Sequence, residues 1–472
     1  MASLKKRYVL IAILLILVIV TLYGIYRPLP EGISYESESY YVEDVDFLYD
    51  LTYLDLEEDV LQIEQQIFSA IEDAIIEAEE FIIFDMFLYN DFYDPELDFP
   101  PLSQHMTDVL IEKKETNPDI EILVLSDEIN TTYGSHSSQH FEQLKDAGID
   151  VVVVDVTKLR DSNPLYSGIW RTFIQWFGQS GNGWLPNAFS PEAPDVTLRS
   201  YLKLFNVKAN HRKVVATERT AIVSSANPHD ASAHHSNIAF QVNGPIIDEL
   251  VYTEHAASEF SNGPTLTNAE ALPVEEGDVE VRVLTEGRIY ERTLEMIDET
   301  ESGDELWLGM FYLSDRNIIN SLIEAANRGA QIRLVLDPNE NAFGQEKVGL
   351  PNRPVAAELL EEAPIEVRWY DTIGEQYHPK LIARVSEDHT TVIGGSANFT
   401  SRNLRDYNLE TNVWVEAPNG HSFSQDISSY FETIWVNEEG HYTVPYEEYR
   451  DQTTWLTRFL YRLQKLTGLT TY

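Results

Sequence analysis

Four polar residue types recur in the same order at two places in this chain. The second occurrence reads Tyr-His-Pro-Lys over residues 377–380, then an apolar run, a polar turn and Gly-Gly-Ser-Ala-Asn over 394–398. In an extended strand, residues two positions apart share a face, so His378 and Lys380 point the same way. Imidazole, ammonium, hydroxyl and amide groups at one point suit an anionic tetrahedral centre, where they act as nucleophile or acid, cation and hydrogen-bonding groups.

The first occurrence carries the same set, from His211-Arg-Lys213 through an apolar run and a turn to Ser224-Ser-Ala-Asn227. Either set alone could be an ordinary surface pair, but the repetition of the whole order predicts that both sets build one site. The candidate catalytic residues are His211, Lys213, His378 and Lys380, and the candidate substrate-binding residues are Ser225, Asn227, Ser396 and Asn398.

This duplicated pattern resembles the phospholipase D superfamily, which is marked by two His-x-Lys motifs, each with a downstream Gly-Ser-x-Asn. The resemblance runs from about Val45 to Val444, and Ser224 replaces the glycine of the family pattern. It implies two similar halves that meet at a shared site, and two-step catalysis through a covalent phosphohistidine. The lysines supply the positive charge, so the resemblance implies neither cofactor nor metal, and activity should survive chelation.

The family usually has an aspartate seven residues after each motif histidine. Here these positions hold Glu218 and Val385, and in the second copy Glu387 or Asp388 could substitute.

A second acidic position of the family, about a dozen residues after the asparagine, contacts a histidine ring. The second copy has Glu410 there, and the first has Ala239. A carboxylate raises the pKa of a histidine, which suits a proton donor. If Glu410 contacts the histidine of its own copy, His211 is the nucleophile and His378 the general acid. Glu218 and Asp230 remain alternative partners of His211.

The elements around the motifs also repeat. A helix over Leu56–Glu79 leads into a strand over 81–89, as a helix over 290–300 leads into a strand over 306–313. Strand, helix and strand then follow at 120–127, 141–147 and 149–155, and at 332–337, 357–363 and 365–371. We therefore expect an α/β fold of two similar α/β/α halves from an internal duplication, with the active site between them and one N-terminal transmembrane helix.

The transmembrane prediction rests on an apolar run from Tyr8 to Tyr26, preceded by Lys5-Lys6-Arg7. The run is long enough to cross a hydrocarbon core of about 30 Å. A cleaved signal peptide is the alternative, but no clear small-x-small site ends the run. Because basic residues favour the cytoplasmic side, we expect a single-pass protein of the cell membrane with its body outside.

The predicted organisation has five parts. They are a cytoplasmic stub and anchor (1–30), a first phospholipase D-like half (31–261), a linker (262–277), a second half (278–445) and an amphipathic C-terminal helix (446–472). An apolar stripe with Trp455 and Leu466 beside Arg458 would let the last part lie on the membrane or pack on the body.

Only the first half carries an insertion, at about 158–206. Trp170, Phe173, Trp176 and Phe177 share one helical face there, which predicts either ordinary core or a lip that touches lipid or roofs the substrate channel. The stretch 199–213 that follows holds five basic residues and no acid, which indicates an anionic group at the site.

Composition limits the partners. The chain has 78 acidic and 33 basic residues, a net charge of −45, and no cysteine. Nucleic acid is therefore an improbable partner, and zero cysteines fit an exported protein. His229, His234 and His235 could suggest a metal, but loop polar residues are the favoured interpretation.

These features together predict a membrane-anchored phosphodiesterase that hydrolyses phospholipid-type phosphodiesters. Two alternatives stay open: phosphatidyl transfer, as in cardiolipin synthases, and a catalytically silent scaffold that binds phospholipid. The partners expected are a phospholipid substrate and the membrane; the headgroup and the oligomeric state are not predicted.

Overall fold

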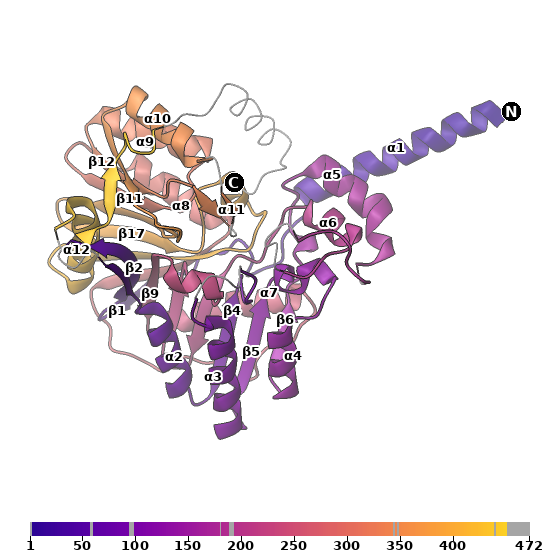
Figure 1. Ribbon diagram of the computed structural model, residues 1–472, viewed down its shortest axis with the longest axis horizontal. Coiled ribbons are helices and arrows are strands. Elements are labelled where there is room, and N and C mark those ends of the chain that lie inside the picture. The colour runs from indigo at the N-terminus through magenta and orange to yellow at the C-terminus, as the bar shows by residue number, and fades with distance from the viewer. Residues whose placement is uncertain are drawn as a thin grey trace.

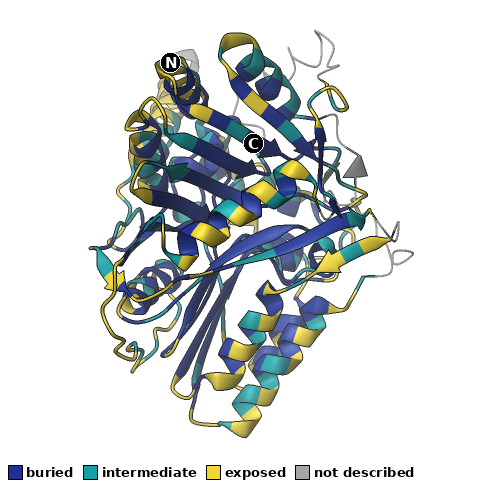
Figure 2. Cartoon of the chain, turned by 90° about the vertical axis from the view of Figure 1, so that its left-hand side faces the viewer, coloured by how far each residue is buried: buried dark blue, intermediate teal, exposed yellow. Residues whose placement is uncertain are grey.

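The computed structural model describes residues 2–450, except 57–59, 94–98, 180, 188–192, 343–344, 347–348 and 439. The predicted C-terminal stripe from Trp455 to Leu466 lies outside the described residues. The chain forms two large mixed sheets with helices on their outer faces (Figure 1), and the predicted α/β class is confirmed. In Figure 2 the strands are almost wholly buried, whereas the flanking helices expose one stripe each.

The first sheet has the order β19-β2-β9-β8-β7-β4-β5-β6, with β3 (Leu61–Glu64) paired to β2. Its parallel edge, where β4 meets β5 and β5 meets β6, adjoins an antiparallel set that carries the first motif. The strands are β19 (Gly440–His441), β2 (Asp46–Asp55), β9 (Asn237–Val242), β8 (Ala221–Ser224), β7 (Lys213–Thr217), β4 (Phe81–Met86), β5 (Glu121–Ser126) and β6 (Asp150–Val153). The helices of this half are α2 (Ile67–Glu77), α3 (Leu102–Thr116), α4 (Gln139–Asp146), α5 (Pro164–Ile169), α6 (Leu198–Leu204) and α7 (Ile246–Phe260).

The second sheet has the order β1-β10-β18-β17-β16-β11-β12-β15-β20 and repeats the arrangement of the first. The strands are β1 (Tyr40–Val42), β10 (Val279–Thr285), β18 (Thr411–Pro418), β17 (His389–Gly395), β16 (Lys380–Val385), β11 (Glu305–Met310), β12 (Gln331–Leu336), β15 (Ile365–Tyr370) and β20 (Thr443–Pro445), and β13 (Asn341–Ala342) pairs with β14 (Gln345–Glu346). The helices are α8 (Gly287–Asp298), α9 (Arg316–Arg328), α10 (Asn352–Glu362), α11 (Ser401–Leu404) and α12 (Ser422–Val436).

The helix predicted over 56–79 is wrong in its first part. The chain forms a hairpin of β2 and β3 there, and α2 begins only at Ile67. The buried carboxylate of Asp50 accepts the backbone N–H groups of Gln66 and Ile67 at 2.7 and 3.1 Å, which satisfies the first donors of the helix. Val60 and Ile63, which lie within the predicted helix, are exposed on the hairpin.

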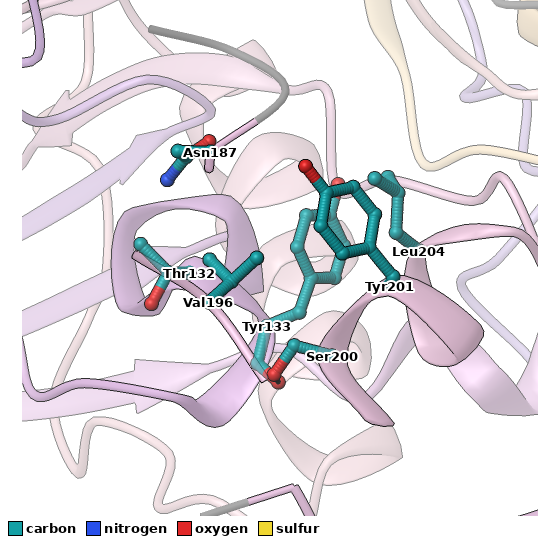
Figure 3. A pocket seen from close by; sticks show the side chains of 7 residues that line it. All are labelled: Thr132, Tyr133, Asn187, Val196, Ser200, Tyr201 and Leu204. Atoms are coloured by element: carbon teal, nitrogen blue, oxygen red, sulfur yellow. Dashed lines mark hydrogen bonds between the residues drawn. The ribbon is translucent and has the colours of Figure 1, made fainter. Parts of the chain in front are cut away.

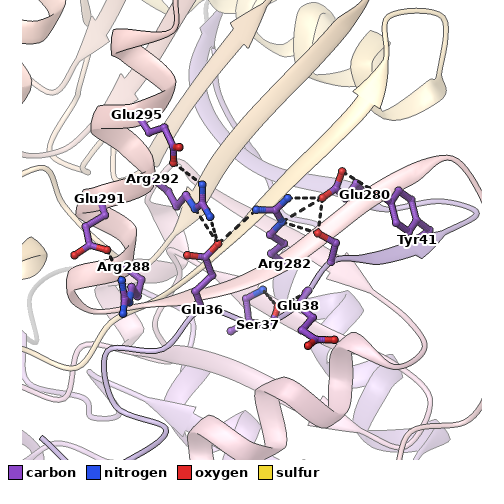
Figure 4. A network of polar contacts seen from close by, with 12 residues as sticks. Glu36, Ser37, Glu38, Tyr41, Glu280, Arg282, Arg288, Glu291, Arg292 and Glu295 are labelled. Atoms are coloured by element: carbon purple, nitrogen blue, oxygen red, sulfur yellow. Dashed lines mark hydrogen bonds and ion pairs between the residues drawn. The ribbon is translucent and has the colours of Figure 1, made fainter.

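Two short strands cross between the halves. Residues 40–42, within the predicted first half, pair as β1 with β10 of the second sheet, and β19 returns from the C-terminal side to pair with β2. Beside β1, Glu36 lies between Arg292 and Arg282, at 2.6 and 3.4 Å (Figure 4). The N-terminal segment is thus fastened to the second half before the chain builds the first.

The halves meet over buried apolar surface, and the buried cation Arg212 also joins them. A Cβ added at Gly394 of β17 would lie 2.5 Å from the ring of Phe240 in β9, so the two sheets approach too closely there for any larger residue. Arg212 is fully buried and pairs with Glu254 of α7 at 3.3 Å and with Glu286, just before α8, at 2.8 Å. Its guanidinium therefore links the first half to the second.

Helix α1 (Ala2–Tyr26) projects from the body beside α5 and α6 (Figure 1). Its segment Lys5–Tyr26 is long and apolar enough to cross a membrane, with a mean hydropathy of 2.9. The last turns of α1 pack against α5, where the backbone N–H of Asp161 donates to Gly24 O at 3.0 Å.

The buried ion pairs of Arg212 give a prediction for stability. Arg212→Met leaves two carboxylates buried without their cation, which costs about 3–5 kcal/mol. Arg316→Met removes an exposed ion pair with Glu358 and should cost about 1 kcal/mol or less. Urea unfolding of the full chain in detergent measures both. Equal losses of unfolding free energy in the two variants would contradict a role of Arg212 in holding the halves together.

Candidate active site

Both histidine motifs lie where the two halves exchange backbone hydrogen bonds. The N–H of His211 donates to Leu409 O at 2.9 Å, and the N–H of His378 donates to Ser236 O at 2.8 Å. Each motif thus runs beside a segment of the other half. The two sets of predicted catalytic residues are brought together by this exchange.

An aspartate at the end of a parallel strand holds each motif in place. Asp127 follows β5 and accepts the N–H of Asn210 at 2.8 Å; Asp337 follows β12 and accepts the N–H of Tyr377 at 2.8 Å. Each accepted N–H belongs to the residue just before a motif histidine. Burial raises the pKa of both carboxyl groups to about 7.

The two lysines occupy equivalent positions. Lys213 Nζ donates to the carbonyl of His211 at 2.7 Å, and Lys380 Nζ donates to that of His378 at 2.6 Å. Phe87 lies against the first His–Lys pair as Phe311 lies against the second, with each ammonium 5.1 Å from its ring centroid. Burial lowers the pKa of Lys213 to about 7 and that of Lys380 well below its usual value. An entering anion would therefore restore their full charge.

The partner predicted for Glu410 is wrong. Its Oε2 lies 2.9 Å from Nδ1 of His211, the histidine of the other copy, and also accepts the Ser396 hydroxyl at 2.6 Å. The crossed pairing explains this, because Leu409 binds the backbone of His211 and carries the next side chain to its ring. A carboxylate only accepts, so Nδ1 of His211 holds the proton and Nε2 keeps its lone pair.

Asn237 is the residue that sequence reasoning missed. Its Oδ1 lies 3.1 Å from Nδ1 of His378 and accepts the Ser225 hydroxyl at 3.1 Å, while its Nδ2 donates to a carbonyl. Asn237, and not Ala239, is thus the counterpart of Glu410. The loop before Glu410 is two residues longer, so counting from the asparagine misplaced the position. The tripeptides His-Ser-Asn237 and Asn-Leu-Glu410 were the available signal.

The histidines differ electrostatically because of these partners. Burial lowers the pKa of His211 to about 4, although Glu410 acts in the opposite direction. Burial also lowers the pKa of His378 well below its usual value, and Lys380 and His235 lower it further. The ring of His235 lies 6.1 Å from that of His378, centroid to centroid, and its Nδ1 accepts a backbone N–H. Both motif histidines are therefore neutral near pH 7 without substrate.

The predicted hydroxyl and amide residues divide into two roles. Ser225 and Ser396 support Asn237 and Glu410, as described above. Asn227 Oδ1 accepts the N–H of Leu88 at 3.2 Å, and this contact does not use the Nδ2 group of Asn227. The buried Asn398 Oδ1 has no hydrogen-bond partner in the described part of the chain. The two asparagines thus keep polar capacity that a ligand could use.

The carboxylates proposed as substitutes for the family aspartate lie elsewhere. Glu218 is buried at the β7–β8 turn, where it accepts the N–H groups of Glu79 and Glu80 at 2.8 and 3.2 Å. Glu387 and Asp388 are exposed at the turn after β16. Asp230, the other alternative partner of His211, accepts the backbone N–H and the hydroxyl of Ser103.

The basic stretch 199–213 does not form a free cationic patch. Lys203 pairs with Glu128, Lys208 with Asp161, and Arg212 with its two glutamates. The attraction for an anion therefore comes mainly from the two motif lysines. No group of three or more metal-ligating side chains occurs in the described residues, and His229 instead contacts Ser232 and the carbonyl of Phe92.

A small pocket lies in the first half (Figure 3). It is bordered by Thr132 and Tyr133, by Asn187 and Val196 of the insertion, and by Ser200, Tyr201 and Leu204 of α6. Its lining contains none of the predicted site residues.

One family and several solved structures are similar to this chain. Residues 293–435 match the family described as "Cardiolipin synthase, PLD-like domain". Phosphatidylserine synthase of Haemophilus influenzae superposes with a TM-score of 0.56 at 12% identity, over 91% of this chain and 95% of that one. A phospholipase D family member, Nuc from Salmonella typhimurium, gives 0.27 at 20% identity, over 35% and 98%.

No curated protein sequence matches the chain. The predicted resemblance to the phospholipase D superfamily is nevertheless confirmed, by the family match in the second half and by the fold of the synthase.

The burial of His211 gives a prediction for pH. Its folded pKa of about 4 lies below the unfolded value of 6.5, so the unfolded chain binds more protons between these two values. Stability from the neutral ring is complete above pH 6.5 and is lost as the pH falls toward 4. Wild type should lose about 3 kcal/mol relative to His211→Asn over this range.

Urea unfolding of both proteins across this pH range measures the difference. His105→Asn, at an exposed position, serves as the reference for substitution of a surface histidine. A constant difference between wild type and His211→Asn would contradict a buried, neutral His211.

Proposed function

We propose that this protein is a phosphodiesterase of the phospholipase D type that cleaves phospholipid-type phosphodiesters through a covalent phosphohistidine. The observation that carries the proposal is the pair of buried imidazoles, each held at Nδ1 by a partner from the other half, beside two buried ammonium groups. Two neutral nitrogen bases and two cations suit nucleophilic attack on an anionic phosphorus centre. The side chains themselves supply the charge stabilisation.

The reaction proceeds in two displacements at phosphorus. Nε2 of one histidine forms a bond to phosphorus as the bond to the leaving oxygen breaks. The other histidine takes up a proton from water when the bound anion raises its pKa, and it gives that proton to the leaving oxygen. The second histidine then takes a proton from water or an alcohol, whose oxygen attacks phosphorus as the P–N bond breaks. Lys213 and Lys380 stabilise the phosphoryl oxygens, and Asn227 and Asn398 help to orient them.

The roles of the two histidines follow from the charge of the intermediate. A carboxylate raises the pKa of the histidine it contacts, which suits a proton donor. Because Glu410 contacts His211, this argument alone would make His211 the general acid and His378 the nucleophile. A phosphohistidine ring that keeps its Nδ1 proton, however, is positively charged for the whole lifetime of the intermediate. Glu410, 2.9 Å from Nδ1 of His211, can offset that charge in a buried site. His211 is therefore the nucleophile, and His378, bound to the neutral amide of Asn237, is the acid and base.

Phospholipid is the substrate class that fits the rest of the chain. The candidate membrane span α1 packs against the half that carries the first motif, so a body held at a bilayer would meet lipid headgroups. A cell-membrane protein with an extracellular body is the corresponding localisation. Phosphatidyl transfer uses the same first step and differs only in the acceptor; a silent scaffold would have no need of both His–Lys pairs.

The enzyme assay tests this directly. His211→Ala and His378→Ala should each reduce turnover of a radiolabelled phospholipid below a few per cent of wild type, because each removes a reacting nitrogen. His105→Ala should retain activity. Products made with and without added glycerol distinguish hydrolysis from transfer. Turnover in either motif variant close to that of wild type would exclude the mechanism.

Trapping assigns the two histidines. With a phosphodiester whose leaving group needs no proton, His378→Ala should accumulate an acid-labile phosphoenzyme on His211, since the general base that activates water is missing. His211→Ala should form no phosphoenzyme. Peptide mapping of the phosphorylated residue is the measurement, and phosphate on His378 in the His211→Ala variant would exchange the roles.

A further inference from the structure

The insertion of the first half exposes an apolar stripe. Helix α5, the π-helical turn η3 (Trp170–Ile174) and the turn η4 (Gln175–Phe177) follow one another, and Leu165, Ile169, Phe173 and Trp176 are spaced by four, four and three residues. These side chains therefore share one face. They are 77, 43, 45 and 74% exposed. Trp170 is buried, so the prediction that it shares a face with Phe173 and Trp176 is wrong, because the chain is π-helical over Trp170–Ile174. Phe177 and Trp184, also in the insertion, are exposed as well.

The stripe lies beside the end of the candidate membrane helix. Thr21 of α1 approaches Gly168 so closely that a Cβ there would lie 2.2 Å from its hydroxyl oxygen. Arg171 Nη1 donates to Val20 O at 3.3 Å, and the N–H of Asp161 donates to Gly24 O. The insertion is thus fixed to residues 20–24 of α1, inside the apolar segment and not beyond it.

This attachment determines how deep the stripe would lie in a bilayer that α1 spans. At 1.5 Å per residue, Val20 lies about 9 Å along the axis from Tyr26. Amphipathic helices that lie in a bilayer interface bury their apolar face by about 5–10 Å. The charged residue that follows α1, Arg27, donates to Thr157 O at 3.0 Å, so a polar boundary coincides with the start of the insertion. A bilayer spanned by α1 would therefore reach the stripe.

We propose that the exposed stripe of α5, η3 and η4 is a second membrane contact, which lies in the outer leaflet next to α1. The occupant is a lipid bilayer, because the stripe continues the exposed apolar surface of α1 and carries the aromatic side chains that favour the interface. Such a contact would be held by apolar side chains, because a chain of net charge −45 is not attracted electrostatically to anionic headgroups. This inference does not depend on catalysis.

The absence of cysteine makes a clean experiment possible. Trp176→Cys and Phe173→Cys each introduce the only thiol of the chain at an exposed position, so the fold is not disturbed. Ile76→Cys on α2, 58% exposed, is the matched control on the body. Each full-length variant is labelled with a nitroxide and reconstituted into phosphatidylcholine vesicles. Its collision rates with oxygen, which concentrates in the bilayer, and with a water-soluble nickel chelate are then measured.

The ratio of oxygen to nickel collisions should be several-fold higher at positions 173 and 176 than at 76. Vesicle attachment itself is not the readout, since α1 alone would give it. A ratio at both stripe positions equal to that at 76 would overturn the proposal, because the stripe would then lie in water. Low collision rates with both reagents would overturn it as well, since protein, such as a second copy, would then cover the stripe.

Discussion

The backbone hydrogen bonds that cross between the halves at the two histidines are the constraint on which the site depends. Leu409 O and Ser236 O each accept the N–H of a motif histidine, and each stands one residue before the side chain that binds that histidine's ring. Neither half alone therefore contains both a motif histidine and the side chain that binds its ring. The docking of the halves, through the apolar interface and the buried Arg212, is a condition of the chemistry and not merely of stability.

Symmetry in the backbone is combined with asymmetry in the side chains. Equivalent positions hold Glu410 and Asn237, and the residues two before them are Asn408 and His235, each of which accepts a backbone N–H before the opposite motif. Once an entering anion has restored the charge of both lysines, these groups and Glu410 carry a net charge of +1 while the histidines are neutral, which is opposite in sign to the charge of the proposed phosphodiester substrate. A carboxylate in both halves would cancel that charge, and an amide in both would leave the proposed phosphohistidine cation without a counter-charge.

The sequence predicted most of the strands and helices and the convergence of the two histidine–lysine pairs, but not which side chain contacts which histidine ring. The spacing of His378 and Lys380 and the repeated strand patterns predicted two equivalent halves, because strand periodicity is local. Which ring Glu410 contacts depends on how the halves dock, and no spacing within one copy contains that information. The helix predicted from Leu56 failed for a different reason: a short amphipathic hairpin can mimic helical periodicity, and the cap supplied by Asp50 is distant in sequence.

The same distinction explains the basic stretch before the first motif. As a pattern it indicated an anion site, yet the fold uses Lys208 to join the insertion to the motif, through a buried Asp161 that also pairs with Arg171. Asp161 binds the backbone of α1, so the candidate membrane span, the insertion and the approach to His211 form one continuous set of polar contacts. A body with 45 net negative charges is repelled by an anionic surface. For the proposed action on lipid headgroups, such a body would need apolar attachment and a rigid link between the membrane and the buried cationic site, and this set of contacts would supply the link.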